Sequence, residues 1–357
     1  MEADVRRIHR LIEEYDKEKL TITTVCSHSS LQIFHGARLE GFKTLGIALK
    51  KPPRYYDAFP LAKPDEFLTV DSYQEIFDIK DQLIEKNVIL VPHGSFVEYL
   101  GADNFRSLPL PTFGNRRVLE WESDRRKQRE WLTSAGVRMP REVKDPKDIN
   151  FPVLVKYDGA KGGRGFFIAR NYQDFLDGID RSKGFTIQEY ILGTRYYFHF
   201  FYSPIKKEGY KLSRGTLEML SIDRRDESNI DEMYKLGSQE QLKKQGIVPT
   251  FVVTGNAPVA IRESLLPKVF DYAEKTVEKS LELFGGIIGP FCLESVVKDD
   301  LEIVVFEISA RIVAGTNLFI KGSPYSDLLE ENMSTGRRIA REIKLARDFG
   351  RLKDVIT

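Results

Sequence analysis

The stretch at residues 289–317, GPFCLESVVKDDLEIVVFEISARIVAGTN, constrains the fold and the chemistry of this chain more than any other. It reads as a β-hairpin, because residues 291–297 and 301–308 are rich in apolar and β-branched side chains and a polar Lys-Asp-Asp sequence separates them. Two carboxylates, Glu294 and Glu307, stand within these strands where a covered sheet would favour valine. An acidic pair inside a covered hairpin needs a chemical explanation.

The length of the turn decides how the two carboxylates relate to each other. With a two-residue turn at Asp299 and Asp300, Glu294 lies opposite Val305, and Glu307 is its diagonal neighbour on the same face. A four-residue turn places the two glutamates directly opposite each other, whereas a three-residue turn would break the parity. In either of the first two registers their backbone positions are ~8 Å apart or less. We therefore expect both carboxylates on one face of the hairpin.

Carboxylates that share one half-buried face repel each other unless a cation lies between them. The stretch offers oxygen ligands and no nearby His or Cys, which favours Mg²⁺ over zinc, with Mn²⁺ as the alternative. We predict that Glu294 and Glu307 bind a metal ion and that Arg311, shortly after the second strand, binds an anion beside it. The competing interpretation is a solvated hairpin face with two unrelated glutamates, which the apolar residues at 304–306 and 308 argue against.

Composition narrows the class of protein. The chain has 357 residues and a formal net charge of +1, which gives no reason to expect a nucleic-acid partner or an anionic membrane. It contains no apolar run of 18 residues, and its charged first residues do not resemble a signal peptide. Two cysteines, Cys26 and Cys292, are too few for a disulfide framework or a zinc site. We expect a cytoplasmic protein of two or three domains.

The first third of the chain reads as the start of a doubly wound α/β sheet. A helix is predicted at 4–19, a strand at 21–25, a helix at 31–40 and a strand at 44–49, with a later strand at 87–91. Strands that alternate with helices in this way form parallel sheets with right-handed crossovers. The pattern is not the glycine fingerprint of a dinucleotide-binding fold.

Polar loops follow two of these strands. Ser-His-Ser-Ser at residues 27–30 follows the first strand, and Pro-His-Gly-Ser-Phe at 92–96 follows the later one. Open α/β sheets bind ligands at the carboxyl ends of their strands, and hydroxyls, an imidazole and helix N-terminal N–H groups suit a phosphate. The alternative for the first loop is an ordinary helix cap by Ser29 or Ser30, with His28 a bystander.

A glycine-rich hairpin is predicted in the middle of the chain, between strands at 152–156 and 166–169. Its glycines are Gly159, Gly162, Gly163 and Gly165. Backbone N–H groups of such a loop can cover phosphates, and Lys156 at the end of the first strand can reach the α- and β-phosphates of a nucleotide. The loop is not a P-loop, because no Gly-Lys-Ser/Thr sequence opens a helix here. The alternative is a flexible turn beside an edge-strand lysine.

A strand at 185–189 comes next and runs into Tyr190, Ile191 and a glycine turn. The backbone of such a segment can bond adenine while Glu189 holds ribose hydroxyls. The aromatic strand that follows carries His199, which we expect to be a core histidine with a hydrogen-bond partner rather than a ligand. Later helices are expected at 267–283 and at 335–348, the second with its Arg and Lys residues facing solvent.

The order of these features resembles the ATP-grasp ligases: a lysine strand, a glycine-rich hairpin, a strand with Gln-Glu-Tyr, and a late pair of strand carboxylates followed by an arginine. Longer segments resemble the archaeal PurP family of formate-dependent 5-formaminoimidazole-4-carboxamide ribonucleotide (FAICAR) synthetases. These segments are SHSSLQI near residue 27, VPHGSF at 91–96, FGNRRVLEWESDR at 113–125, KGGRG at 161–165, SIDRRDESNID at 221–231, VVTGNAPVAIRESLLP at 252–267, GPFCLES at 289–295 and FEISARIVAGTN at 306–317. The match runs in order over nearly the whole chain.

The resemblance implies a fold with two domains. An N-terminal doubly wound α/β domain, the pre-ATP-grasp domain, is expected at 1–119, and an ATP-grasp domain at 120–357. Within the second, the lid with the glycine-rich hairpin is expected at 120–200 and the part with the metal carboxylates at 201–357. The resemblance also suggests a closed homo-oligomer.

The resemblance assigns roles to residues that the pattern alone leaves open. It implies that Glu227 contacts ATP, and that Asn256 contacts the substrate alongside His28 and Ser95. From the residues alone, the polar run at 221–229 is as readily a solvated loop as a site, and the amide of Asn256 is ordinary turn chemistry.

The activity that the resemblance implies is the ligation of formate to 5-aminoimidazole-4-carboxamide ribonucleotide (AICAR) in purine biosynthesis. Formate attacks the γ-phosphate of ATP to give formyl phosphate and ADP, and the amine of AICAR then attacks the formyl carbon to give FAICAR. Glu307 and Arg311 are expected at the reacting groups, Arg311 because its planar fork matches a carboxylate. Two alternatives are an ATP-grasp ligase for another carboxylate and amine, and a non-catalytic protein that binds AICAR or AMP.

Overall fold

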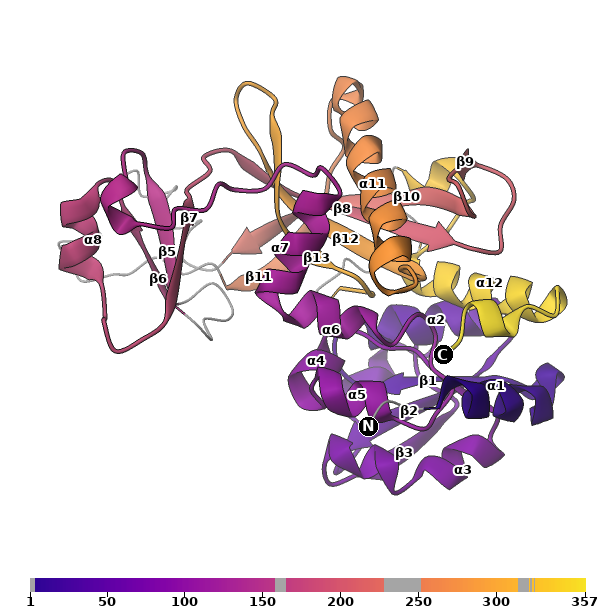
Figure 1. The fold of residues 1–357 in the computed structure, drawn as a ribbon. Helices are drawn as coiled ribbons and strands as arrows, with labels where there is room; N and C mark the ends of the chain where they lie inside the picture. The colour runs from indigo at the N-terminus through magenta and orange to yellow at the C-terminus, as the bar shows by residue number, and fades with distance from the viewer. Residues whose placement is uncertain (1–3, 158–164, 228–251, 314–320, 322, 324) are drawn as a thin grey trace.

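The computed structural model describes residues 4–157, 165–227, 252–313, 321, 323 and 325–357. Figure 1 shows three parts: an N-terminal α/β unit, a large central sheet above it, and a small sheet that stands apart on one side. Within the described residues, no helix combines the length and the apolar character needed to cross a bilayer. The glycines Gly159, Gly162 and Gly163 lie outside the described residues.

A parallel sheet forms the N-terminal unit, as the sequence predicts. Its strands run in the order β3 (Glu66–Val70), β2 (Lys43–Leu49), β1 (Thr21–Val25) and β4 (Val88–Leu90), and all adjacent pairs are parallel. The helices of this unit are α1 (Val5–Glu14), α2 (Ser30–Leu39), α3 (Lys80–Glu85), α4 (Ser95–Tyr99) and α5 (Ala102–Ser107). Because β1 and β4 are neighbours and point the same way, the loops that follow them leave from the same edge of the sheet.

The central sheet is antiparallel, with the main apolar core on one face and the site carboxylates on the other. Its strands run in the order β11 (Val253–Pro258), β10 (Thr216–Glu227), β8 (Thr194–Ser203), β12 (Gly289–Val297) and β13 (Ile303–Ser309), with β9 (Tyr210–Lys211) beside β10. Phe200 and Phe291 stack on the apolar face, where α11 (Leu266–Phe284) contributes Phe270 and α7 (Arg125–Ser134) contributes Trp131. The loop interpretation of residues 221–229 is wrong up to Glu227, because pairing with β11 continues β10 to that residue.

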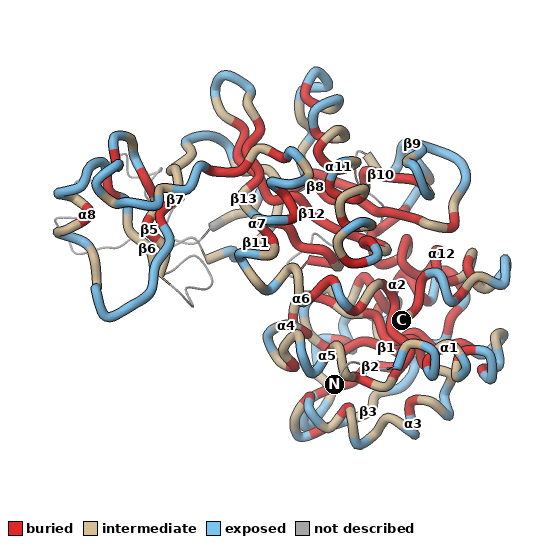
Figure 2. The backbone as a smooth tube through the Cα atoms, in the orientation of Figure 1, coloured by how far each residue is buried: buried red, intermediate tan, exposed pale blue. Residues whose placement is uncertain are grey.

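The small sheet contains the strands on both sides of the predicted glycine-rich hairpin and is called the lid below; the predicted lid at 120–200 also included α7 and most of β8, which belong with the central sheet. The strands of the small sheet run in the order β6 (Phe166–Ala169), β5 (Val153–Tyr157) and β7 (Phe185–Glu189), and α8 (Tyr172–Gly178) covers one face. A separate small core holds it together, made of Ile149, Val153, Val155, Ala169, Phe175 and Ile187. Figure 2 shows that most of the remaining lid surface is exposed or half-buried, so this sheet shares little of its core with the rest of the protein.

The late helix α12 (Thr335–Asp348) lies against α2 of the N-terminal unit (Figure 1). The prediction that its basic residues face solvent is wrong. Arg338 is 4% exposed, and Arg341 donates to both carboxylate oxygens of the buried Glu40 at 2.6 and 2.9 Å. The reason is that α12 is covered on more than one side, so its arginines are buried together with carboxylate partners that compensate their charge.

Two glycines bring α2 and α12 into backbone contact. A Cβ atom added to Gly36 would lie 2.2 Å from the Arg337 nitrogen, and one added to Gly336 would lie 2.2 Å from the Gln32 carbonyl oxygen. The Gly336 N–H also donates to Gln32 Oε1 at 3.1 Å. Because no side chain fits between the helices at this point, the crossing holds them in one fixed relation.

Replacing Gly36 by alanine tests this contact. In an open helix the change would stabilise the protein by about 1 kcal/mol, but here the added methyl group must force the two backbones apart. We expect Gly36→Ala to lower the free energy of unfolding by roughly 1–3 kcal/mol, the usual effect of overpacking. Chemical denaturation measures it, with Thr133→Ala at an exposed helical position as the control. A more stable Gly36→Ala protein would contradict the backbone contact.

Candidate active site

The hairpin β12–β13 carries its two glutamates directly opposite each other. The turn between the strands contains three residues, since the Lys298 N–H donates to the Glu302 carbonyl oxygen at 3.0 Å, and Leu301 in this turn has a φ of 68°. A three-residue turn alone would place the two glutamates on opposite faces of the hairpin. A register shift beside Glu294 returns them to one face, because Ser295 pairs with Val305 while Glu294 pairs with Glu307.

The shift is a β-bulge in which Phe306 is the additional residue. Both turn lengths from which we derived the one-face arrangement, two and four residues, are therefore wrong. The one-face arrangement itself is confirmed, but the bulge rather than the length of the turn produces it. Directly opposed residues have Cβ atoms about 4.5–5.5 Å apart, so the two carboxylates are close enough to share one ion.

The two carboxylates differ in their surroundings. Glu294 is buried and accepts hydrogen bonds from Ser309 Oγ at 3.1 Å and from Arg225 Nη1 at 3.5 Å. Glu307 keeps access to solvent although protein surrounds its carboxylate on several sides. Burial and the neighbouring Glu294 raise the pKa of Glu307 to about 7, although Lys156 and Arg225 act in the opposite direction. The pair therefore holds excess negative charge.

Arg225 on β10 is a site residue that our sequence reasoning missed. Its guanidinium lies 3.7 Å above the ring centroid of Tyr197 and contacts Glu294. Two of its buried donors, Nε and Nη2, have no hydrogen-bond partner among the described residues. An arginine that is stacked, paired and still has unused donors is well placed to bind an anion. Its position in the polar run after an apolar strand was the available signal.

Glu122 on α6 (Val118–Ser123) is a second residue that we missed. Its two carboxylate oxygens accept hydrogen bonds from Arg311 Nη2 at 2.5 Å and from the Ala310 N–H at 2.8 Å. Burial raises the pKa of Glu122, and Arg311 opposes this shift. The signal was its place on the helix, because Glu122 falls on the same stripe as the buried Val118 and Leu119.

Arg311 lies where the sequence places it, shortly after the second carboxylate. Glu122 occupies only Nη2 of its guanidinium, and the buried Nε and Nη1 have no hydrogen-bond partner among the described residues. Glu122 thus fixes the direction of the fork and leaves two donors for another group. This geometry fits the predicted anion site beside the carboxylate pair.

The loops that follow β1 and β4 contact each other, as the topology predicts. Ser27 Oγ and Ser95 Oγ are 3.0 Å apart, and Ser29 Oγ donates to the Val313 carbonyl oxygen at 2.8 Å. The second contact joins the N-terminal loop to the segment just after Arg311. His28 is exposed, whereas Ser95 is fully buried and orients Ser27 rather than opening to solvent.

The interpretation of Ser29 or Ser30 as an ordinary helix cap is wrong. No side chain caps α2, because the Ser29 hydroxyl donates to Val313 and the Ser30 hydroxyl to the Ser27 carbonyl oxygen. Ser29 itself has a φ of 64°, a left-handed conformation that is unusual for serine. A helix N-terminus without a side-chain cap, flanked by an exposed imidazole, suits a phosphate.

The lid places Lys156 toward the carboxylate pair. Burial lowers the pKa of Lys156, with Arg125 and Arg195 adding to the effect and Glu307 opposing it. The lysine is therefore electrically coupled to Glu307 although it belongs to another sheet. Of the predicted glycines only Gly165 is described, and its φ of 76° is one that side chains disfavour.

Glu189 and Tyr190 have partners within the protein. Glu189 Oε2 accepts hydrogen bonds from Arg138 Nη2 at 2.9 Å and from the Arg141 N–H at 3.0 Å. The Tyr190 N–H donates to the Pro152 carbonyl oxygen at 2.9 Å, so this donor is used inside the lid, while Ile191 continues toward β8. Any nucleotide contact by Glu189 would have to share its carboxylate with these arginines.

The remaining predicted residues lie on the polar side of the central sheet. Asn256 on β11 is directly opposite Arg225, so it faces the same side. Glu227 is the last residue of β10; its side chain lies outside the described residues. His199 is a buried core histidine, as predicted, with Nε2 at 3.0 Å from Asp223 Oδ2.

Two family models match the chain. One, described as "Domain of unknown function (DUF1297)", covers residues 174–357, and the other, described as "Protein of unknown function (DUF1246)", covers residues 22–143. Among curated relatives, the 5-formaminoimidazole-4-carboxamide-1-(beta)-D-ribofuranosyl 5'-monophosphate synthetase of Methanosarcina barkeri is 62% identical over 352 residues, and the match covers 99% of each chain.

Two solved structures are similar to this chain. The IMP biosynthesis protein PurP from Thermococcus kodakaraensis has a TM-score of 0.74 and 32% identity, covering 94% of this chain and 100% of that one. The biotin carboxylase domain of a Hydrogenobacter thermophilus carboxylase, in complex with MgADP, has a TM-score of 0.60 at 16% identity, covering 90% and 69%, and shares the fold alone. The predicted fold class, an ATP-grasp fold behind an N-terminal α/β domain, is confirmed. The chain belongs to the PurP family of 5-formaminoimidazole-4-carboxamide ribonucleotide synthetases.

Proposed function

We propose that this chain is an ATP-dependent ligase that formylates AICAR to FAICAR, with formate as the formyl donor. The observation that carries the proposal is the convergence of Glu294, Glu307 and Arg311 with the loop at residues 27–30. This convergence supports a phosphoryl-transfer centre next to a loop suited to a nucleotide phosphate. The name of the relatives supports AICAR as the acceptor.

The reaction divides into two displacements. An oxygen of formate forms a bond to the γ-phosphorus of ATP while the bond to the bridging oxygen breaks and ADP leaves. The amine nitrogen of AICAR then bonds the formyl carbon, the bond from that carbon to the phosphate oxygen breaks, and the amine loses a proton. The first step is needed because phosphate leaves the formyl carbon far more readily than an oxide ion would leave free formate. Water must be excluded, since it would hydrolyse formyl phosphate.

Glu294 and Glu307 fit a magnesium ion. They supply oxygen donors only, and a bound cation would relieve the negative charge that contributes to the raised pKa of Glu307. Mg²⁺ is usually held by one or two carboxylates together with substrate phosphates. Consistent with that mode, no set of three or more His, Cys, Asp or Glu residues forms a ready-made metal cage in the described part of the chain. When bound, the ion would neutralise charge on the transferring phosphoryl group.

The arginines orient the anionic reactants. Arg311, whose fork is fixed by Glu122, offers two donors to formate or to the acyl phosphate. Arg225 offers two more beside Glu294, and Lys156 of the lid neutralises the nucleotide phosphates. A role of the glycine-rich hairpin at these phosphates stays a prediction, because Gly159, Gly162 and Gly163 lie outside the described residues.

AICAR lies across the boundary between the N-terminal unit and the central sheet. Its phosphate binds at the uncapped N-terminus of α2 with His28 beside it, and its amine points toward Glu307 and Arg311. Asn256 contacts the carboxamide from the polar face of the sheet, and Ser95 supports the loop through Ser27.

ADP release tests the reaction as a whole. Purified protein with ATP and Mg²⁺ should release ADP only when formate and AICAR are both present, and each is omitted in turn. Release with other carboxylates but not formate would favour a ligase of different specificity. Binding of AICAR without any ADP release would favour a non-catalytic binding protein.

Glu307→Gln tests the metal assignment. The amide keeps the shape and removes the charge, so kcat should fall at least about 100-fold, since charge stabilisation by a metal is worth several kcal/mol. AICAR affinity, measured by calorimetry, should stay nearly unchanged. Glu302→Gln in the same hairpin, whose carboxylate pairs with Arg138 and Lys298, serves as the control. A near-normal rate with unaltered Mg²⁺ dependence in Glu307→Gln would refute the assignment.

His28→Ala tests the AICAR site. A lost charge-assisted hydrogen bond is worth about 1.5–3 kcal/mol, so AICAR affinity should fall roughly 10- to 150-fold. ATP affinity should barely change, because its contacts come from the lid and the central sheet. Calorimetric titration of both ligands gives the result, with His9→Ala on α1 as the control for loss of an imidazole. If His28→Ala binds AICAR as tightly as the parent, the assignment of this site is wrong.

A further inference from the structure

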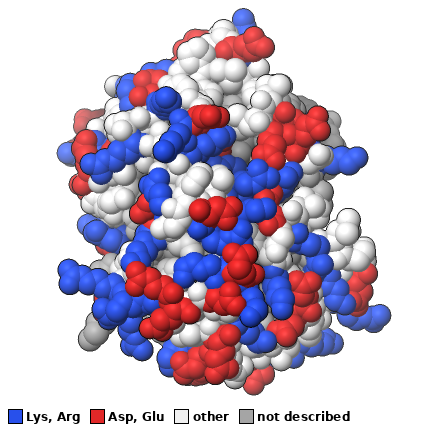
Figure 3. Space-filling model, turned by 90° about the vertical axis from the view of Figure 1, so that its right-hand side faces the viewer, with Lys and Arg blue, Asp and Glu red and all other residues white. Residues whose placement is uncertain are grey.

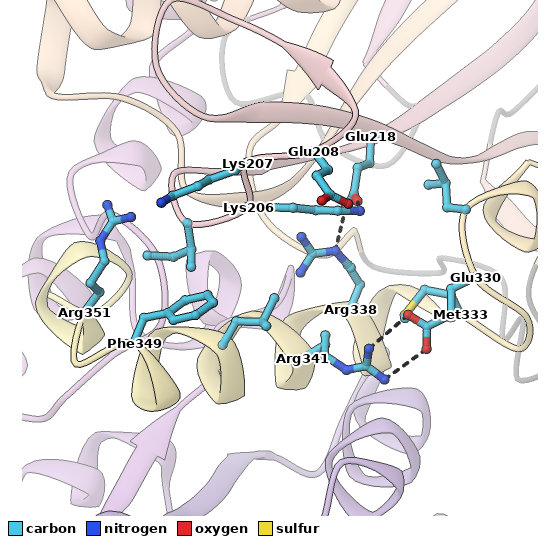
Figure 4. A pocket seen from close by; sticks show the side chains of 13 residues that line it. Lys206, Lys207, Glu208, Glu218, Glu330, Met333, Arg338, Arg341, Phe349 and Arg351 are labelled. Carbon is cyan, nitrogen blue, oxygen red and sulfur yellow. Dashed lines mark hydrogen bonds and ion pairs between the residues drawn. The ribbon is translucent and has the colours of Figure 1, made fainter.

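A cavity of about 650 Å³ lies away from the proposed active site, on the other half of the central sheet. It is bounded by residues 205–208 after β8, by Glu218 on β10, and by α12 with the segments on both sides of it (Figure 4). Phe201, which packs against Arg338 of this cavity, lies four residues along β8 from Tyr197 of the carboxylate site, or about 13 Å. The volume of the cavity falls within the range of small-molecule sites, roughly 300–1,000 Å³.

The cavity floor is a buried cluster of charges. Arg338 donates from Nε to Glu218 at 2.5 Å and from Nη1 to Glu342 at 2.8 Å, and its guanidinium lies 4.1 Å from the Phe201 ring centroid. Lys206 also contacts Glu218. Arg338 is 4% exposed, yet its Nη2 has no hydrogen-bond partner among the described residues. A buried donor without a partner costs stability unless something fills the position.

Cations outnumber carboxylates around the cavity. Its lining includes Lys206, Lys207, Arg338, Arg341 and Arg351, against Glu208, Glu218 and Glu330. Figure 3, which views the molecule from the side of α12, shows both signs intermixed over the surface rather than one large positive patch. Behind the lining, Glu342, Glu40 and Asp354 pair with Arg338, Arg341 and Arg351, so most of this positive charge is compensated. Lys207 at the rim has no charged partner among the described residues.

The remaining wall is apolar. Ile205, Leu329, Met333, Leu345 and Phe349 contribute to it, and the Phe349 side chain is 64% exposed. Figure 4 places the Phe349 ring between Arg351 on one side and the cavity on the other. An exposed aromatic ring in a cavity that also holds Lys207 and the unused Nη2 of Arg338 offers stacking and charge to the same ligand.

We propose that this cavity is an effector site for a small organic anion with an aromatic body, of the size of a nucleoside monophosphate. A bare inorganic anion would leave the apolar wall unused, and a neutral aromatic would leave the cations unused. The anionic group lies toward Lys207 and Arg338, and the aromatic body lies against Phe349 and Leu345.

The coupling to the active site passes through α12. Arg341 lines the cavity and also holds Glu40, which ends α2, and Arg337 donates to the same carboxylate at 2.8 Å. At its other end α2 begins at Ser30, next to the loop that carries His28. Arg338 and Arg341 are on the same helix, and Gly36 and Gly336 fix that helix to α2, so an anion bound at Arg338 also bears on the α2 loop. The two sites must then influence each other reciprocally.

Three matched probes test the binding site: 1-naphthyl phosphate, inorganic phosphate and 1-naphthol. Calorimetry on the full chain, with ADP and AICAR present to fill the proposed active site, should show binding of 1-naphthyl phosphate and at least about tenfold weaker binding of each partial probe. Equal binding of phosphate and 1-naphthyl phosphate would overturn the aromatic part of the proposal. No binding of 1-naphthyl phosphate at millimolar concentration would overturn the site.

Variants of two lining residues test whether 1-naphthyl phosphate binds in this cavity. Lys207→Glu and Phe349→Ala should each weaken 1-naphthyl phosphate binding at least about tenfold. The controls are Lys211→Glu on β9 and Leu328→Ala, which are exposed and do not line the cavity, and both should bind as the parent does. Unchanged binding in both cavity variants would overturn the assignment. So would a change of oligomeric mass by analytical ultracentrifugation in Lys207→Glu or Phe349→Ala, because the cavity would then be an interface with a second copy.

The effector role is read from AICAR affinity, and this readout rests on the proposed function, whereas the cavity variants locate the probe without it. Saturating 1-naphthyl phosphate should shift the AICAR dissociation constant at least about fivefold, and Phe349→Ala should abolish the shift. Probe binding without any shift would overturn the effector role. If the protein binds the probe but not AICAR, the proposed function fails and the cavity remains a binding site, so the two failures are distinguishable.

Discussion

The repulsion between Glu294 and Glu307 is the constraint on which the rest of the structure depends. Two carboxylates directly opposite each other on a covered sheet are unfavourable by themselves, and cations from several parts of the chain offset them. Arg225 comes from β10, Lys156 from the lid, and Arg311 from the segment after β13, where Glu122 orients it. Groups from the lid, the central sheet and α6 thus all act on the charge of one hairpin.

The sheet separates this charge from the main core by simple alternation. On β8, Tyr197 and His199 face the polar side, while Phe198 and Phe200 face α11 and α7. One strand therefore serves both as a core element and as the base of the site. The polar face continues beyond the site to Glu218, where Arg338 compensates it. On this face Glu294 pairs with Arg225 and Glu218 pairs with Arg338. Both arginines keep buried donors that have no partner among the described residues.

Periodicity predicted the elements that carry the site, and topology predicted that two loops would meet. The alternation around Glu294 and Glu307 predicted the two strands, but the placement of both glutamates on one face depends on a bulge that the pattern does not show. A bulge at Phe306 inserts one apolar residue into an apolar strand, so it leaves no mark in a hydrophobic pattern. The parallel order of β1 and β4 follows from local signals, and the contact between Ser27 and Ser95 follows from that order.

Contacts between distant segments were the part that the sequence could not supply. Glu122 pairs with Arg311 across 189 positions, and a charged residue in a helix is by default read as solvated. The arginines of α12 were misread for the same reason, since their carboxylate partners lie on α2 and β10. Burial of a charge depends on what packs over it, and only the assembled structure contains that information.

The packing of α12 on α2 constrains the order in which parts of the protein can fold during translation. Gly336 and Gln32 are 304 positions apart, and the core of the N-terminal unit mixes Ile8, Ile12 and Ile33 with Ile339, Ile343 and Ile356. During translation the apolar surface of α2 must therefore wait for nearly all of the ATP-grasp part to leave the ribosome. Domains usually fold as they emerge, N-terminal first. Here the first unit to be made is among the last to be completed, and until then its exposed surface is available to chaperones.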